Sequence, residues 1–140
     1  MCIFCDIVSG EIEAEVVFED VVSLAFLDHR PLFPGHTLLV PREHHETLTD
    51  LPAPLITPLF SNAQLLAGAV QTAMEAEGTF VAMNNKISQS VPHLHVHIVP
   101  RRRKDGLRGF FWPRKRYGGG EMKSAADAVR SAVEQLSSAQ

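Results

Sequence analysis

The chain has 140 residues, of which 45% are hydrophobic and 21% charged, with a formal net charge of −3. This length predicts one domain, and the composition excludes an intrinsically disordered chain, which would carry fewer apolar residues and more net charge. No apolar run approaches the ~20 residues of a membrane span, and no signal-peptide pattern opens the chain, so we expect a cytoplasmic protein without a membrane partner.

Residue patterning predicts alternating strands and helices along the chain. The predicted strands, in chain order, cover residues 16–19, 21–27, 36–40, 79–83 and 93–99. The predicted helices cover residues from about 54 to 76 and from 121 to 137, where apolar residues recur at three- and four-residue spacing. Since several strand pairs are close in sequence, the pattern favours an α+β fold, with an antiparallel sheet, one main helix and a C-terminal helix.

Both cysteines lie near the start of the chain, as the C-x-x-C pair Cys2 and Cys5. A structural disulfide is not expected in a cytosolic protein. A redox C-x-x-C needs a strand before it, which the residue pattern does not predict. The pair therefore favours half of a zinc site, provided that two further ligands lie elsewhere in the chain.

A basic segment at 101–116 holds eight of the 13 basic residues and one acidic residue. Its net charge is +7 and that of the remaining chain is −10. Aromatic residues accompany it: Phe110, Phe111, Trp112 and Tyr117. Such a segment could bind nucleic acid by charge and stacking. A solvated face, or a rim that attracts an anionic small molecule, is favoured over nucleic acid.

The segment 93–99 carries the strongest functional signal, because His93, His95 and His97 alternate along a predicted strand. Alternate side chains share a face, and neighbouring imidazoles would be about 6.7 Å apart. The intervening apolar residues would enter the core: Leu94, Val96 and Ile98. A row of imidazoles can act on a phosphate as nucleophile, base or acid near neutral pH. The alternatives are surface histidines, or an all-histidine metal site, for which the three are too collinear.

These residues resemble the signature of the histidine-triad (HIT) superfamily of nucleotide hydrolases and transferases. The stretch at 2–12 is similar to the start of bacterial Hint-like members, and those at 24–28 and 34–41 are similar to the family's nucleoside-binding and second-histidine segments. Gln89, Ser90 and Val91 also match. The resemblance covers residues 1–100 and implies a single HIT-like domain over 1–140, whose part 101–140 is a variable basic loop and a C-terminal helix.

The resemblance implies a hydrolase that cleaves at the α-phosphate of purine nucleoside phosphoramidates or dinucleoside polyphosphates and releases a nucleoside monophosphate. His95 would be the nucleophile that forms a nucleotidyl-histidine intermediate. His97 would contact phosphate or leaving-group oxygens, His36 would support the triad by hydrogen bonding, and His93 completes the catalytic set. The alternative is a nucleotide-binding regulator or adaptor with incidental turnover. A nucleic-acid repair protein is a third, weaker interpretation, prompted by the basic segment.

The resemblance also assigns nucleotide contacts. Asp28 would hold the ribose hydroxyls, as an ionised carboxylate that only accepts hydrogen bonds. Ser90 would contact the phosphate or the leaving group, with Gln89 nearby. The loop at 84–89 lacks the glycines usual in the family, which leaves Asn85 as its candidate phosphate contact. The base pocket would be built from Ile3, Phe4, Phe26 and His29, although core packing is an equal alternative for the first three.

Some family members carry a closed structural zinc site, and the matching residues here are Cys2, Cys5, His44 and His93. His45 is the alternative to His44, and free thiols are the alternative to a metal. No organic cofactor is implied. Family members of this size commonly form homodimers, and the strongly apolar predicted helix at 54–76 is an independent indication of one.

Overall fold

The computed structural model describes residues 1–107 and 114–138. The chain divides into two compact units, Met1–Asp105 and Gly106–Gln140. The first unit holds a five-stranded sheet with helices, and the second holds one helix. All the candidate site residues belong to the first unit.

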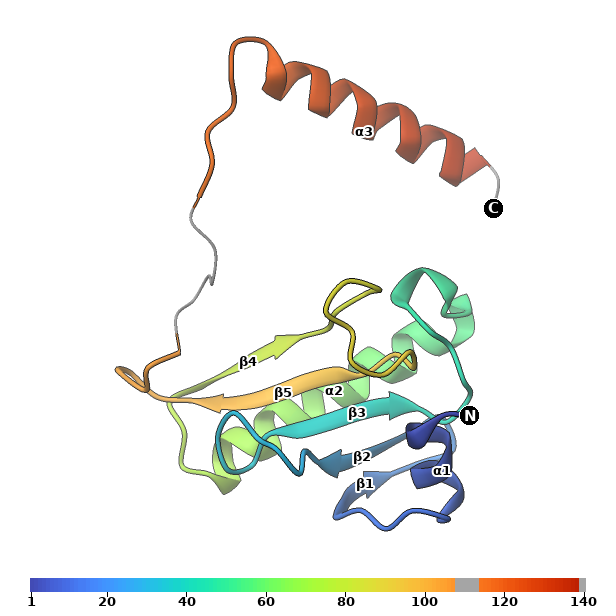
Figure 1. Ribbon diagram of the computed structural model, residues 1–140, viewed down its shortest axis with the longest axis vertical. Coiled ribbons are helices and arrows are strands. Elements are labelled where there is room, and N and C mark those ends of the chain that lie inside the picture. Colours follow the sequence, from blue (N-terminus) through green and yellow to red (C-terminus); the bar gives the residue numbers. More distant parts are fainter. Residues whose placement is uncertain (108–113, 139–140) are drawn as a thin grey trace. The chain divides into compact units, whose positions relative to one another are not determined.

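Every neighbouring strand pair in the sheet is antiparallel, and the strand order is β1-β2-β3-β5-β4 (Figure 1). The strands are β1 (Val16–Glu19), β2 (Ser23–Leu27), β3 (Thr37–Pro41), β4 (Gly78–Ala82) and β5 (Val96–Arg101). The α+β prediction with an antiparallel sheet is confirmed. One boundary matters for function: β5 begins at Val96, so that His93 and His95 lie in the segment leading into the strand.

The main helix, α2 (Ala53–Ala73), covers one face of the sheet (Figure 1). Its buried stripe packs against apolar side chains of the strands, in one cluster that includes Leu59, Ala63, Leu66, Val70, Ala25, Leu39, Leu94, Val96 and Ile98. Of the described helices, α2 is long and apolar enough to cross a membrane, a test that core helices of soluble proteins also pass. Its packing on the sheet is that of a core helix.

A short helix, α1 (Ile3–Ser9), covers the opposite face of the sheet. Phe4 packs there against side chains that alternate along β2 and β3 with those facing α2, namely Leu24, Phe26, Leu38 and Val40. The residue pattern does not predict α1, because seven residues are too few for a clear periodicity. Its ends do carry local signals, since Cys2 Sγ accepts from the Cys5 N–H and Gly10 ends the helix with a φ of 85°.

The loop from β2 to β3 ends at Gly35, directly before His36. Gly35 has a φ of 96°, and a Cβ at this position would lie 2.5 Å from Met74 Cγ in the turn after α2. Both facts require glycine here. The turn therefore fixes where β3 starts and where the His36 ring is placed.

The second unit contains α3 (Glu121–Ser138), an amphipathic helix whose apolar side chains are exposed: Met122, Val129, Val133 and Leu136. The helix prediction is confirmed, whereas the single-domain prediction stays a prediction. Part of the predicted basic segment, including Phe110, Phe111 and Trp112, lies outside the described residues.

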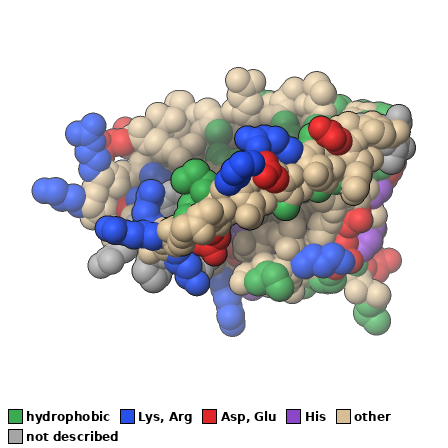
Figure 2. Space-filling model, turned by 90° about the horizontal axis from the view of Figure 1, so that it is seen from above, with side chains coloured by type: hydrophobic (Ala, Val, Ile, Leu, Met, Phe, Trp, Pro, Cys, Tyr) green, Lys and Arg blue, Asp and Glu red, His purple; other side chains and the backbone are tan. Residues whose placement is uncertain are grey.

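Several of the described basic side chains form ion pairs with acidic residues. Arg101 pairs with Asp105, Arg103 with Glu77, and Lys123 with Asp127. On the face shown in Figure 2, Lys and Arg side chains (blue) are interspersed with Asp and Glu side chains (red). This mixture is typical of a solvated surface.

Candidate functional site

The triad histidines meet on the α1 side of the sheet, where β3 and β5 run side by side. His97 pairs across the strands with Leu38, and side chains of directly paired residues share a face. Since Leu38 belongs to the cluster around Phe4, His97 also faces α1. His36 lies directly before β3, next to that same pair.

A chain of hydrogen bonds defines the ring protons of His36 and His97. The backbone N–H of Leu32 donates to His36 Nδ1 at 3.0 Å, so neutral His36 carries its proton on Nε2. That Nε2–H donates to His97 Nδ1, also at 3.0 Å, and neutral His97 therefore carries its proton on Nε2. Asp28 Oδ2 lies 3.8 Å from His36 Nε2. The relay ends in an N–H donor at His97 Nε2.

His95 has the opposite arrangement. Its Nδ1 lies 2.8 Å from the carbonyl oxygen of His93, which can only accept, so the lone pair is on Nε2. The His95 and His97 ring centroids are 4.9 Å apart. This is closer than the about 6.7 Å of a regular strand, because His95 precedes β5 and the two rings meet edge to face. The site thus places a nitrogen lone pair beside an N–H donor.

Burial keeps the rings of His36 and His97 uncharged. Desolvation, followed by the charges of His95 and His36, lowers the pKa of His97 to about 4. Desolvation also lowers the pKa of His36, although Asp28 opposes the shift. Both rings are therefore neutral at pH 7, as the hydrogen-bond relay requires.

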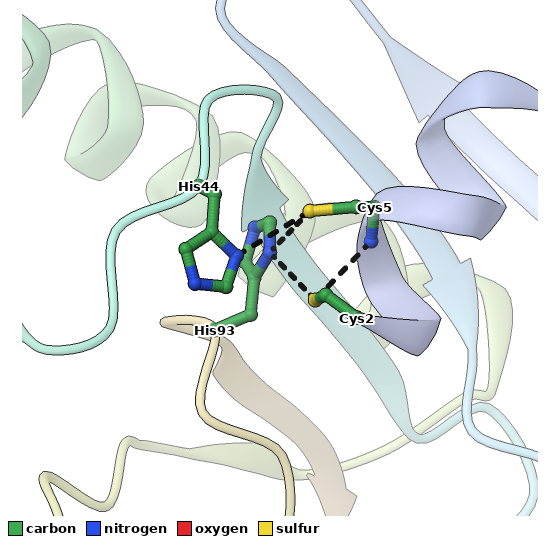
Figure 3. A group of neighbouring side chains, drawn as sticks. All are labelled: Cys2, Cys5, His44 and His93. Atoms are coloured by element: carbon green, nitrogen blue, oxygen red, sulfur yellow. Dashed lines mark hydrogen bonds between the residues drawn. The ribbon is translucent and has the colours of Figure 1, made fainter.

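The ring of His93 is directed at the two cysteines of α1. Its Nδ1 lies 3.4 Å from Cys2 Sγ and 3.5 Å from Cys5 Sγ, and its Nε2 lies 2.8 Å from the Pro41 carbonyl oxygen. His44 Nδ1 is 3.3 Å from Cys5 Sγ. Figure 3 shows the four side chains pointing toward one another from α1, from the loop after β3 and from the segment before β5.

These four side chains suit a metal ion, since their donor atoms all lie within 4.8 Å of one another. The Pro41 carbonyl takes the Nε2 proton of His93, which leaves its Nδ1 lone pair facing the sulfurs. Tetrahedral zinc would hold sulfur and nitrogen about 3.5 Å apart, close to the S–N distances just given. Desolvation and then Cys2 raise the pKa of the Cys5 thiol, and a bound cation would favour its thiolate form.

The alternative ligand His45 takes no part in this group. Its Nε2 lies 3.1 Å from Glu43 Oε2, and its carbonyl oxygen accepts from the Leu94 N–H at 2.7 Å. The geometry therefore favours His44 over His45.

Four of the predicted nucleotide contacts line one groove of about 920 Å³ beside α1: Ile3, Phe26, Asp28 and His29. Asp28 is partly buried, and its Oδ1 accepts from the Arg30 N–H at 2.9 Å. Apolar walls with a few polar groups, Asp28 among them, are typical of small-molecule sites.

Phe4, the fifth base-pocket candidate, is not among the residues lining that groove. It is 6% exposed, and its ring centroid lies 6.0 Å from that of His93 and 5.0 Å from that of His95. Phe4 therefore packs from α1 against the ring of His95, as the core-packing alternative describes.

The loop between β4 and β5 holds two further candidates, which fasten it to the segment before η1 (Leu48–Asp50). Asn85 Oδ1 accepts from the Leu48 N–H at 2.7 Å. Gln89 Nε2 donates to the Glu46 carbonyl at 2.6 Å, and its Oε1 accepts from the Lys86 N–H at 2.8 Å. Both amides thus tie the loop to residues 46–48.

Lys86 and Ser88 take the conformations that glycines would otherwise supply in this loop. Their φ angles are 71° and 60°, in the left-handed region. Ser90, the remaining candidate, is exposed, and its hydroxyl has no hydrogen-bond partner among the described residues. It is accessible to a ligand.

Three of the groups that orient the histidines are main-chain atoms, which the residue pattern does not reveal. They are the Leu32 N–H and the carbonyl oxygens of Pro41 and His93. The acidic groove residues Glu13 and Glu15 were also not predicted, because exposed glutamates carry no motif.

A family model described as the HIT domain matches residues 9–104. Because this match covers more than half of the chain, the protein belongs to the HIT domain family. The chain is also similar to a crystal structure of a HIT family protein from Bacillus subtilis, with 34% identity, a TM-score of 0.84 and coverage of 93% of this chain and 95% of that one. The predicted HIT-like fold is confirmed.

Named relatives and a metal-bound structure extend this comparison. Adenosine 5'-monophosphoramidase HNT1 from Saccharomyces cerevisiae is 39% identical over 76% of this chain and 66% of its own length. Adenylylsulfatase HINT3 from Arabidopsis thaliana is 33% identical over 76% and 55%. A Zn-bound histidine triad family protein from Mycobacterium smegmatis has a TM-score of 0.72, with 35% identity and coverage of 99% of this chain and 97% of that one.

Proposed function

We propose that this protein is a nucleotide hydrolase that cleaves at the α-phosphate of purine nucleoside phosphoramidates or dinucleoside polyphosphates, through a nucleotidyl-histidine intermediate on His95. One observation carries the proposal: the Nε2 lone pair of His95 stands beside the relay that ends in the Nε2–H of His97. The names of the yeast and Arabidopsis relatives, a phosphoramidase and an adenylylsulfatase, support the same reaction class.

In the first step, His95 Nε2 attacks the α-phosphorus and forms an N–P bond. The bond from phosphorus to the leaving amine or phosphate breaks, and the leaving group takes the electron pair together with a proton from solvent. In the second step, water attacks phosphorus and gives up a proton to solvent, the N–P bond breaks, the electron pair of that bond returns to His95 Nε2, and the monophosphate leaves. His97 is neutral at pH 7, so it serves as a fixed hydrogen-bond donor to the developing negative charge rather than as an imidazolium acid.

The nucleoside would lie in the groove beside α1, with Asp28 accepting from the ribose hydroxyls and Phe26 and Ile3 against the base. Ser90 would contact the phosphate or the leaving group, since its hydroxyl is exposed. Asn85 and Gln89 would instead hold the loop that carries Ser90, through their contacts with Leu48 and Glu46.

We also propose that Cys2, Cys5, His44 and His93 hold a zinc ion. Bound there, zinc would supply a structural cross-link, because its four protein ligands leave no open position for substrate. The residues themselves would then pin α1, and with it Phe4, against the segment that carries His95. The zinc-bound relative supports this assignment.

A cytoplasmic homodimer remains our proposal for the assembled state. It is supported by apolar side chains of α2 that are exposed in the single chain: Ile56, Phe60 and Leu65. Surfaces of this kind are typical of interfaces.

The function is tested by following AMP release from adenosine 5′-phosphoramidate and from diadenosine tetraphosphate, with wild type, His95→Ala and, as a control, His45→Ala. We expect turnover by wild type and by the control, and a loss of at least ~10³-fold in His95→Ala with AMP binding retained. Release from the phosphoramidate alone would identify a phosphoramidase, and release from the tetraphosphate a dinucleotide hydrolase. Turnover retained by His95→Ala would reject the nucleophile, and nucleotide binding without any release would favour the regulator.

A further inference from the structure

The groove beside α1 carries two acidic residues to which no role has yet been given. Glu13 and Glu15 line it together with Asp28, and no Lys or Arg does so among the residues that the structure describes. Neither glutamate side chain has a hydrogen bond or an ion pair within the described part of the chain. The groove therefore offers acceptors and disfavours an anionic occupant.

The rest of the groove is almost entirely apolar, with walls from Ile3, Ile7, Ile12, Ala14, Phe26 and Leu27. Such walls accommodate the two faces of a flat ring, while the polar edge of the ring must meet the few polar groups present. Glu15 is close to the ribose end, because its carbonyl oxygen accepts from the Leu27 N–H at 3.0 Å, one residue before Asp28. A base whose ribose contacts Asp28 would thus have these carboxylates within the same groove.

Guanine and adenine differ in what they present to a carboxylate. An ionised carboxylate has two acceptor oxygens and no donor. Guanine places its N1–H and its exocyclic amino group side by side, so that two parallel N–H donors can meet the two oxygens. Adenine places the unprotonated N1 beside its amino group, and one of the two contacts becomes repulsive.

We propose that Glu13 and Glu15 make the base groove selective for guanine over adenine, so that the preferred ligands are guanosine 5′-phosphates. This inference rests on the proposed function, because it takes the groove as the base site of a nucleotide. It goes further in assigning the base and the residues that choose it. The expected discrimination is about tenfold, since hydrogen bonds to charged groups are strong but both glutamates are solvent-exposed.

The test compares GMP and AMP binding by titration calorimetry, which needs no turnover. The proteins are wild type, Glu13→Gln, Glu15→Gln and the double variant, with Glu11→Gln/Glu134→Gln as a control that changes net charge equally outside the groove. Wild type and the control should bind GMP about tenfold more tightly than AMP. In the double variant the ratio should fall to within about twofold, with an unchanged melting temperature.

Equal affinities in wild type, a GMP preference that survives in the double variant, or binding of neither nucleotide would each overturn the inference. Turnover of guanosine and adenosine 5′-phosphoramidates separates the two proposals. If GMP is preferred but neither phosphoramidate is hydrolysed, the proposed function fails and the guanine assignment stands. If both phosphoramidates are hydrolysed with equal kcat/KM and both nucleotides bind equally, the guanine assignment fails and the hydrolase stands.

Discussion

Two clusters of side chains lie near His95, and in each of them the donor atoms are close enough together to hold a metal ion. The cysteine cluster consists of Cys2, Cys5, His44 and His93, and the aspartate cluster of Asp28, His36 and His97. In both, the donor atoms lie within 4.8 Å of one another. By distance alone, both clusters would therefore be candidate metal sites.

The clusters differ in where their ring protons lie. In the cysteine cluster, the Pro41 carbonyl takes the His93 proton and leaves a lone pair facing the sulfurs. In the aspartate cluster, the Leu32 N–H donates to His36 Nδ1, and the proton on His36 Nε2 lies between the rings of His36 and His97. A metal bound to His36 Nε2 would move the ring proton to Nδ1, where it would face the N–H of Leu32. The proton positions of the first cluster thus fit the proposed zinc site, and those of the second fit the proposed hydrogen bond from His97 to a substrate.

The largest expected effect comes from removing the thiols. Wild type purified without a His tag should contain about one zinc per chain, and Cys2→Ser/Cys5→Ser less than ~0.2, if only the cysteine cluster binds metal. The variant should lose about 3 kcal/mol of unfolding free energy, or about 10 °C in Tm. Asp28→Asn is the control and should keep its zinc. Less than ~0.2 zinc per chain in wild type would contradict the proposed zinc site.

A smaller effect is expected from breaking the relay. His36→Leu leaves His97 Nδ1 without its hydrogen-bond donor and no longer fixes the proton of His97 on Nε2. We therefore expect kcat to fall by about 10–100-fold with KM nearly unchanged. Zinc content should not change, because His36 lies outside the cysteine cluster. His45→Leu serves as the matched control. An unchanged kcat in His36→Leu would show that His97 needs no such support.

The smallest effect concerns the pH dependence of stability. The pKa of His97 is about 4 in the folded protein and about 6.5 when unfolded, so the unfolded chain takes up the proton first. Its contribution is therefore present above pH 6.5 and lost as pH falls toward 4. Between pH 7 and 5, wild type should lose about 1–2 kcal/mol more than His97→Asn in urea unfolding. Parallel losses in the two proteins would contradict the buried, neutral His97.

Part of this arrangement could be predicted from residue patterns. Strict alternation at 93–99 predicted which residues enter the core, and Leu94, Val96 and Ile98 are all fully buried. Turn residues and apolar periodicity predicted all five strands and both long helices to within a few residues. These features are local, so that a window of a few residues contains the necessary information.

The rest depends on contacts between distant parts of the chain. The pairing of β3 with β5 brings His36 to His97 across 61 positions, and no local pattern encodes it. Helix α1 is too short for a periodic signal, although it positions Phe4 against His95. The resemblance suggested the members of both clusters, but their protonation depends on the backbone around them.

The backbone origin of the three orienting hydrogen bonds bears on how this site can change over evolutionary time. An N–H or a carbonyl oxygen survives almost any replacement of its own side chain, so substitutions at positions 32 and 41 leave both partners in place. The positions of the ring protons thus depend on the course of the backbone rather than on the identity of neighbouring side chains. Surrounding side chains can be replaced while His95 keeps the lone pair on its Nε2.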